Sequence, residues 1–207
     1  MMRLWHAVIA LIAAVALVTQ LVLVIDKDAS VVNFFSYFTI QSNILVMIAS
    51  ALIALKPDRG GTVFGILRMA GLVGITITGI IFSTVLAGKV EFDGIAWWTD
   101  KAFHYIVPAM AVIGFVAMKP RTRLDKNSLW FVGWAVAWLA YTLIRAEVAD
   151  PVYAVTSTTF SKVPYDFLDV DVHGSGSVAI ACAGVTVLAL ALATFYIWLS
   201  KRESVNA

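Results

Sequence analysis

The stretch "WHAVIALIAAVALVTQLVLVI", residues 5–25, contains no Asp, Glu, Lys or Arg and is long enough to cross a lipid bilayer. The hydrocarbon core of a bilayer is about 30 Å thick, so a spanning helix needs about 20 apolar residues. The stretch is longer than the apolar core of a cleaved signal sequence, and no clear small-residue cleavage site follows it. We therefore expect residues 5–25 to form a first transmembrane helix.

The rest of the chain repeats this pattern. Of its 207 residues 61% are hydrophobic and only 14% are charged, whereas soluble domains are nearer 25% charged. Together with the first stretch, five further apolar runs predict an all-α integral membrane protein, one six-helix bundle over residues 1–207. These five runs cover residues 32–55, 64–87, 98–118, 128–148 and 176–200. The single cysteine, Cys182, excludes an intramolecular disulfide, and the net charge of +2 gives no indication of a nucleic-acid partner.

The distribution of Lys and Arg predicts the orientation of the bundle. Positive residues collect in the cytoplasmic loops of membrane proteins. Ten of them fall on the side of the two termini: Arg3, Lys56, Arg59, Arg68, Lys119, Arg121, Arg123, Lys126, Lys201 and Arg202. Five fall on the other side: Lys27, Lys89, Lys101, Arg145 and Lys162. We therefore expect both termini in the cytoplasm, in the plasma membrane of a bacterium.

Four polar residues interrupt the second apolar run, in "FFSYFTIQSNILV", residues 34–46. If this run is one helix, Ser36, Thr39 and Asn43 share a face, because residues three and four apart are neighbours on a helix. Polar side chains at membrane depth turn toward the interior of a bundle. The pattern therefore predicts a polar stripe inside the bundle, while Gln41 points elsewhere.

A histidine lies at a matching depth in the fourth run, which begins "AWWTDKAFHYIVPAM". At 1.5 Å per residue, Thr39 and His104 each lie roughly 10–12 Å from the end of their helix on the same side of the membrane. Asp100 lies one turn before His104. Pro108 lies one turn after it and is expected to kink the helix.

This combination indicates nucleophilic chemistry. A threonine hydroxyl attacks an ester only when a base takes its proton, and an imidazole suits that role. We therefore predict Thr39 as nucleophile and His104 as base, with Asp100 orienting the ring. Asn43 or Ser42 would support a developing oxyanion. Packing roles compete with this assignment, since membrane threonines and histidines also join helices through hydrogen bonds.

Three segments resemble a known family. "SYFTIQSNIL" (36–45), "KAFHYIVP" (101–108) and "VPYDFLDV" (163–170) look like bacterial six-helix membrane proteins distantly related to the androgen-induced protein and androgen-dependent TFPI-regulating protein family. Animal members of that family are membrane hydrolases that cleave fatty acid esters of hydroxy fatty acids with a threonine and a histidine. By motif, the resemblance implies that Thr39 and His104 fill these roles.

Further residues are candidates for binding. Arg145, at the end of the fifth run, would either lie at the membrane interface or pair with a substrate carboxylate. Tyr141, one turn deeper on the same face, and Ser36 could line the same cavity. In the long loop 149–175, an acidic group would be either a solvated turn or a cation site: Asp166, Asp169, Asp171 and His173. In the third run, small residues predict close helix packing: Gly71, Gly74 and Gly79.

The favoured interpretation is an intramembrane hydrolase of lipid esters that needs no metal or cofactor. Its partners would be a lipid substrate and the bilayer, and the oligomeric state is not predicted. A small-solute transporter is one alternative, although the inner halves of the runs contain few polar residues and no inverted repeat is visible. A non-catalytic lipid-binding or sensor protein is the other alternative, and only activity distinguishes it from an enzyme.

Overall fold

The computed structural model describes residues 1–156 and 158–202. Its elements are α1 (Met2–Asp26), α2 (Val31–Ser36), α3 (Phe38–Leu55), α4 (Thr62–Ile81), η1 (Phe82–Leu86), α5 (Gly94–Lys101), η2 (Ala102–Ile106), α6 (Val107–Ala117), η3 (Lys126–Trp130), α7 (Phe131–Ala149), β1 (Tyr153–Ala154), β2 (Phe160–Ser161), η4 (Asp166–Leu168) and α8 (Val170–Lys201). Among these residues, six helical segments are long and apolar enough to cross a membrane, as the apolar runs predict.

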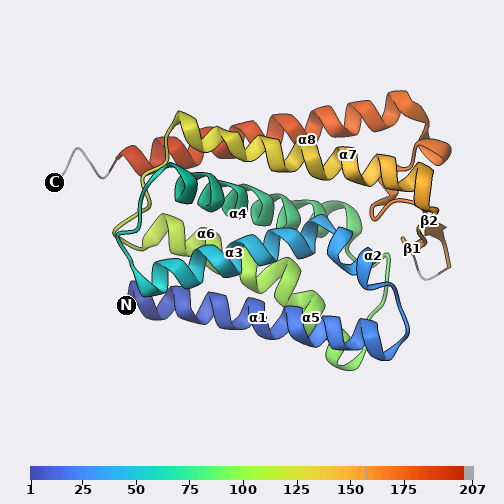
Figure 1. Ribbon diagram of the computed structural model, residues 1–207, viewed down its shortest axis with the longest axis horizontal. Coiled ribbons are helices and arrows are strands. Elements are labelled where there is room, and N and C mark those ends of the chain that lie inside the picture. Colours follow the sequence, from blue (N-terminus) through green and yellow to red (C-terminus); the bar gives the residue numbers. More distant parts are fainter. Residues whose placement is uncertain (157, 203–207) are drawn as a thin grey trace.

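Helix α4 is the centre of the bundle (Figure 1). It packs against α3 and α6 on one side and against α7 and α8 on the other, while α1 packs against α3. Its Met69 and Leu72 are fully buried. The start of α1 and the last turn of α8 lie at one end of the bundle, and the β1–β2 hairpin lies at the other, called the hairpin end below.

Glycines bring α4 close to its neighbours, as their spacing predicts. A Cβ atom on Gly71 would lie 3.4 Å from the backbone of Leu45 in α3. A Cβ atom on Gly74 would lie 2.8 Å from the hydroxyl of Ser42 and 3.0 Å from the ring of Trp134 in α7. A larger side chain at either position would push the helices apart, so small residues set this packing distance.

The second predicted helix is broken, and the expectation of one continuous helix over residues 32–55 is wrong. Helix α2 ends at Ser36, Tyr37 has an extended backbone (φ −67°, ψ 131°), and α3 begins at Phe38. The ring of Tyr37 packs edge-on against Tyr153 and Tyr165, which come from the long loop. These distant contacts favour the break, which makes Thr39 part of the first turn of α3.

Two π-helical segments on neighbouring helices contact each other. Segment η2 contains His104 and directly precedes Pro108, which lies in the first turn of α6. A proline has no N–H and cannot continue a regular helix ladder, so the wider turn accommodates the irregularity predicted there. Segment η1 continues α4, and its Phe82 stacks on the imidazole of His104 with the ring centroids 3.7 Å apart. π-helical turns often occur at functional sites.

The long loop folds back over the hairpin end. Strands β1 and β2 pair antiparallel, with Tyr153 opposite Ser161. After η4, the carboxylate of Asp169 caps α8 by accepting from the backbone N–H groups of Asp171 and Val172. Helix α8 thus begins before the predicted residue 176, and Gly174 interrupts it with a left-handed φ of 75°. The described part of the loop therefore covers this end of the bundle and brings Tyr165 beside α3.

Arg68 does not flank a cytoplasmic loop, contrary to its place in the charge count. It lies inside α4, is only 1% exposed, and places its guanidinium 5.7 Å from the centre of the Phe115 ring. His6, in α1, is equally buried and contacts the hydroxyl of Ser50 at 3.3 Å. Without Arg68, the count is nine positive residues against five, which still favours the same orientation.

Candidate active site

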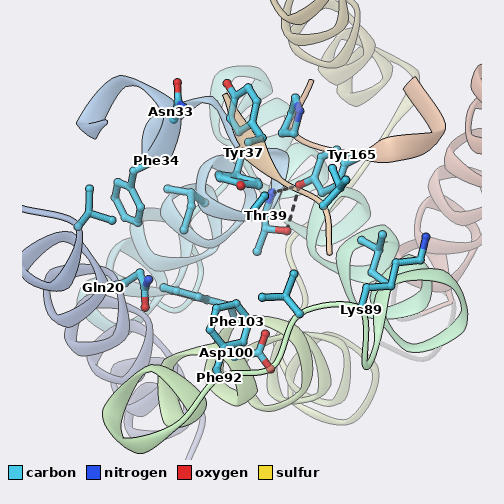
Figure 2. A pocket seen from close by; sticks show the side chains of 18 of the residues that line it. Gln20, Asn33, Phe34, Tyr37, Thr39, Lys89, Phe92, Asp100, Phe103 and Tyr165 are labelled. Atoms are coloured by element: carbon cyan, nitrogen blue, oxygen red, sulfur yellow. Dashed lines mark hydrogen bonds between the residues drawn. The ribbon is translucent and has the colours of Figure 1, made fainter. Parts of the chain in front are cut away.

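Thr39 lies at the start of α3, where backbone N–H groups have no partner within the helix. Its N–H donates to the phenol oxygen of Tyr165 at 3.1 Å, and its Oγ1 lies 3.2 Å from the same oxygen. Figure 2 shows both contacts as dashed lines. The break at Tyr37 therefore gives Thr39 two features of a nucleophilic site, a buried hydroxyl and a backbone donor that is free of the helix ladder.

His104 lies within reach of that hydroxyl. Its Nε2 is 3.5 Å from Oγ1 of Thr39, the outer limit of a hydrogen bond. The two residues, for which the sequence predicts matching depths, are thus in contact. Catalytic hydrogen bonds are often long without substrate and shorten in the reacting complex, so this distance is compatible with proton transfer.

The other imidazole nitrogen is held by Asp100. His104 Nδ1 hydrogen-bonds to the backbone oxygen of Asp100 at 3.0 Å. It also lies 2.9 Å from the carboxylate Oδ1, which is close but not aligned for a hydrogen bond. Both neighbours are acceptors, so Nδ1 carries the proton of the neutral ring and Nε2 offers its lone pair to Thr39. The second carboxylate oxygen pairs with Lys101 at 3.0 Å.

A mixed cavity of about 370 Å³ opens beside Thr39 at the hairpin end. Apolar side chains such as Phe34 and Phe92 form most of its wall, together with a few polar ones. Figure 2 shows Thr39 and Tyr165 on one wall, with Gln20 and Asp100 across the cavity from them. Besides Thr39 and three tyrosines, the polar and charged lining residues are Gln20, Ser30, Asn33, Lys89, Asp100, His104 and Asp166.

A second, apolar cavity of about 180 Å³ lies on the other side of Thr39, between α3, α4, α7 and α8. Its wall includes Val73, Ile77 and Val185. Four residues line both cavities: Thr39, Phe82, Leu86 and Tyr165. Thr39 is therefore at the junction of a mixed cavity and an apolar one, whereas His104 lines only the mixed cavity.

Asn43 and Ser42 line neither cavity, which argues against the oxyanion role predicted for them. The Asn43 amide donates to the backbone oxygen of Thr39 at 2.8 Å and to that of Phe103 at 3.4 Å. It thereby joins α3, which carries Thr39, to the residue before His104. Ser42 packs against Gly74. Both are fully buried because their side chains face neighbouring helices, so Asn43 positions the Thr39–His104 pair from behind.

Ser36, Tyr141 and Arg145 form a separate group, which corrects their predicted place at the substrate. The hydroxyl of Ser36 lies 2.9 Å from that of Tyr141. The Arg145 guanidinium donates to Asn33 at 2.6 Å and to Tyr153 at 2.5 Å. None of the three lines either cavity. For Ser36 the reason is the break at Tyr37, which ends the helical face that Ser36 was predicted to share with Thr39. They fasten α7 to α2 and β1.

The acidic group of the loop is used internally. Asp166 pairs with His173 at 3.1 Å, and Asp169 accepts from Ser161 at 2.5 Å while capping α8. Among residues 1–156 and 158–202, no three His, Cys, Asp or Glu side chains are grouped as a metal site requires. The structure thus gives the cation interpretation no support.

Tyr165 is the main residue that the sequence interpretation missed. Burial raises the pKa of its phenol above the ordinary value, so the group keeps its proton and remains a hydrogen-bond donor. The only sequence signal was its place in "VPYDFLDV", and no periodicity relates that loop to Thr39. Comparison with known proteins returns no match: no protein-family model, no characterised protein and no solved structure is significantly similar to the chain.

Proposed function

We propose that the chain is an intramembrane hydrolase of lipid esters in which Thr39 is the nucleophile and His104 the general base. One observation carries the proposal. His104 Nε2 lies 3.5 Å from the Thr39 hydroxyl, while Nδ1 is held by Asp100, so the lone pair of the imidazole faces the hydroxyl. The resemblance to bacterial relatives of the androgen-induced protein family supports the same two roles.

The reaction would proceed through an acyl-enzyme. As Oγ1 of Thr39 attacks the ester carbonyl carbon, His104 Nε2 takes the hydroxyl proton and the carbonyl oxygen becomes an oxyanion. The C–O bond of the ester then breaks, His104 gives its proton to the departing alkoxide, and an acyl group stays on Thr39. Water then attacks this acyl group as His104 takes its proton; the bond between Oγ1 of Thr39 and the acyl carbon breaks, His104 returns the proton to Oγ1, and the fatty acid leaves.

Tyr165 and the start of α3 would stabilise the oxyanion. The N–H of Thr39 is free of the helix ladder, and the phenol of Tyr165 lies within hydrogen-bond distance of both that N–H and Oγ1. A carbonyl oxygen that takes the phenol's place at this N–H would accept a second hydrogen bond from the phenol O–H. Donors fixed in a low-dielectric site stabilise developing negative charge strongly.

A lipid is the class of substrate that suits this position. Thr39 lies within one of six helices that are long and apolar enough to span a membrane, and it borders an apolar cavity. An ester that reaches Thr39 is stabilised by the burial of its apolar chain, with a free energy of about 0.8 kcal/mol per methylene relative to water. Fatty acid esters of hydroxy fatty acids are the specific candidates that the family resemblance implies.

The bundle is proposed to sit in a bacterial plasma membrane with both termini cytoplasmic, which places the hairpin end and the mixed cavity outside. A reporter enzyme that is active only in the cytoplasm should be active when it is fused after residue 207. A reporter enzyme that is active only after export should be active when it is inserted in the β1–β2 hairpin. A cytoplasmic reading from the hairpin would reverse the proposed orientation.

Replacing Asp100 by Asn is expected to lower kcat only modestly, by about 10- to 100-fold. The backbone oxygen of residue 100 still accepts from His104 Nδ1, so the imidazole keeps its tautomer. What is lost is the charge that stabilises the imidazolium as it forms. The measurement is kcat with one ester for the wild type and the Asp100→Asn variant, together with thermal unfolding in detergent. A loss as large as that of a His104 variant would mean that the carboxylate, not the backbone, sets the tautomer.

The proposed function is tested by turnover. The purified protein in lipid nanodiscs should release free fatty acid from a panel of long-chain esters that includes fatty acid esters of hydroxy fatty acids. The Thr39→Val variant, in which a methyl group replaces the hydroxyl, is the matched control for contaminating esterases. Equal release by the two proteins, or release by neither, would reject the hydrolase.

A further inference from the structure

We infer that the apolar cavity holds the acyl chain of the ester and that the mixed cavity holds its alcohol part. The inference rests on the proposed function and deepens it, because it fixes which half of the substrate is selected by which set of residues. It begins with the position of Thr39, which lines both cavities and therefore lies where an ester reaching from one into the other would place its carbonyl carbon.

His104 decides the direction of the ester. It must give its proton to the alkoxide oxygen that departs, so this oxygen has to lie near Nε2. His104 lines the mixed cavity and not the apolar one. The alcohol part therefore extends into the mixed cavity, and the carbon chain on the other side of the carbonyl extends past Thr39 toward α7 and α8. The reverse orientation would leave the alkoxide without its acid.

The chemistry of the two walls agrees with this direction. The mixed cavity carries Gln20, Asn33 and Lys89, which suit an alcohol that bears a polar group. The apolar cavity is walled almost entirely by aliphatic and aromatic side chains. An apolar cavity of about 150 Å³ binds benzene, so a volume of 180 Å³ holds a hydrocarbon segment larger than that ring.

A longer acyl chain has a way out of the apolar cavity. Two residues of its wall, Val136 on α7 and Leu190 on α8, are 60% and 45% exposed on the apolar outer surface of the bundle. Both helices pack on α4, and the cavity lies between them. The far end of a chain can therefore extend between α7 and α8 into the bilayer. Fatty acid would enter and leave by this lateral route.

Ala189→Phe on α8 is the variant that tests the assignment, because Ala189 lines the apolar cavity and not the mixed one. Ala191→Phe is the matched control, an exposed alanine two residues further along α8 that lines neither. Two ester series are compared, one that lengthens the acyl chain on a fixed alcohol and one that lengthens the alcohol on a fixed short acyl group.

Ala189→Phe should lower kcat/KM for long acyl chains at least about tenfold more than for short ones, because about two methylenes of a long chain would lose their place in the cavity. The alcohol series should keep its wild-type length dependence, and Ala191→Phe should keep both. If Ala189→Phe instead changed the length dependence of the alcohol series, the assignment of the two cavities would be reversed. Equal losses in both series would remove the apolar cavity from substrate selection.

Cys182 supplies a second readout that needs no catalysis. It lines the apolar cavity and is the single cysteine of the chain, so alkylation by N-ethylmaleimide reports on this one position of the cavity wall. In the Thr39→Val protein, palmitate should slow alkylation of Cys182 several-fold, whereas butyrate should not. Protection without hydrolysis by the wild type would reject the proposed function and keep the cavity as a fatty-acyl site. Hydrolysis without protection would reject the cavity assignment alone.

Discussion

Replacing Thr39 by valine is expected to lower kcat for ester hydrolysis by about 10⁴-fold or more, the scale of losing the nucleophile of a nucleophile–base pair. Valine keeps the shape of threonine but has no Oγ1 to attack the carbonyl carbon. Thr39→Ser, which keeps the hydroxyl, should retain part of the activity. The measurement is fatty acid release by the purified variants in the same nanodiscs.

His104→Ala should lower kcat by about 10²- to 10⁴-fold, since the threonine then has no base. The double variant, Thr39→Val with His104→Ala, should be no slower than Thr39→Val alone, because the two side chains act as one unit. Independent, multiplying losses would mean that His104 serves the reaction without activating Thr39. Wild-type activity in Thr39→Val would remove the nucleophile altogether.

Tyr165→Phe is the second substitution with a large expected effect, a loss of about 10²-fold in kcat, typical of removing one oxyanion donor. The ring remains to pack against Tyr37 and Phe167, so the fold of the loop should persist. The phenol interacts with charge that develops only during the reaction, so KM should change little. A rise in KM with unchanged kcat would assign Tyr165 to substrate binding.

Tyr141→Phe is the matched control for this prediction. It removes a phenol that contacts Ser36 at 2.9 Å and lines neither cavity, so kcat should stay near that of the wild type. A comparable loss of kcat in both variants would indicate a general effect on packing at the hairpin end, and Tyr165 would lose its special role.

The part of the fold that follows from local pattern was predictable. Apolar run length gave the six long helices, and the rise per residue placed Thr39 and His104 at one depth. The nearness of Asp100 to His104 also followed from local spacing, but Nδ1 hydrogen-bonds to the backbone oxygen of Asp100 and not to the carboxylate that the sequence pattern predicts as its partner. These features depend on residues that are neighbours along the chain.

The features that the sequence did not reveal depend on distant contacts. The break at Tyr37 is stabilised by rings of the long loop, more than 100 residues away. A continuous helix had placed Ser36 beside Thr39, and the break separates them. Tyr165 and Arg145 could be assigned only once the loop was seen folded over the hairpin end, where Tyr165 contacts Thr39 and Arg145 binds Asn33 and Tyr153.

The most direct test of the central claim is to look for the acyl group on Thr39. Wild-type protein is mixed with a long-chain ester, quenched in acid within the first turnovers, digested and analysed by mass spectrometry. The account predicts a peptide containing Thr39 that carries the mass of the acyl group, formed far more slowly in His104→Ala and absent in Thr39→Val. An acyl group on a different residue, or labelling at Thr39 that is equally fast without His104, would contradict it.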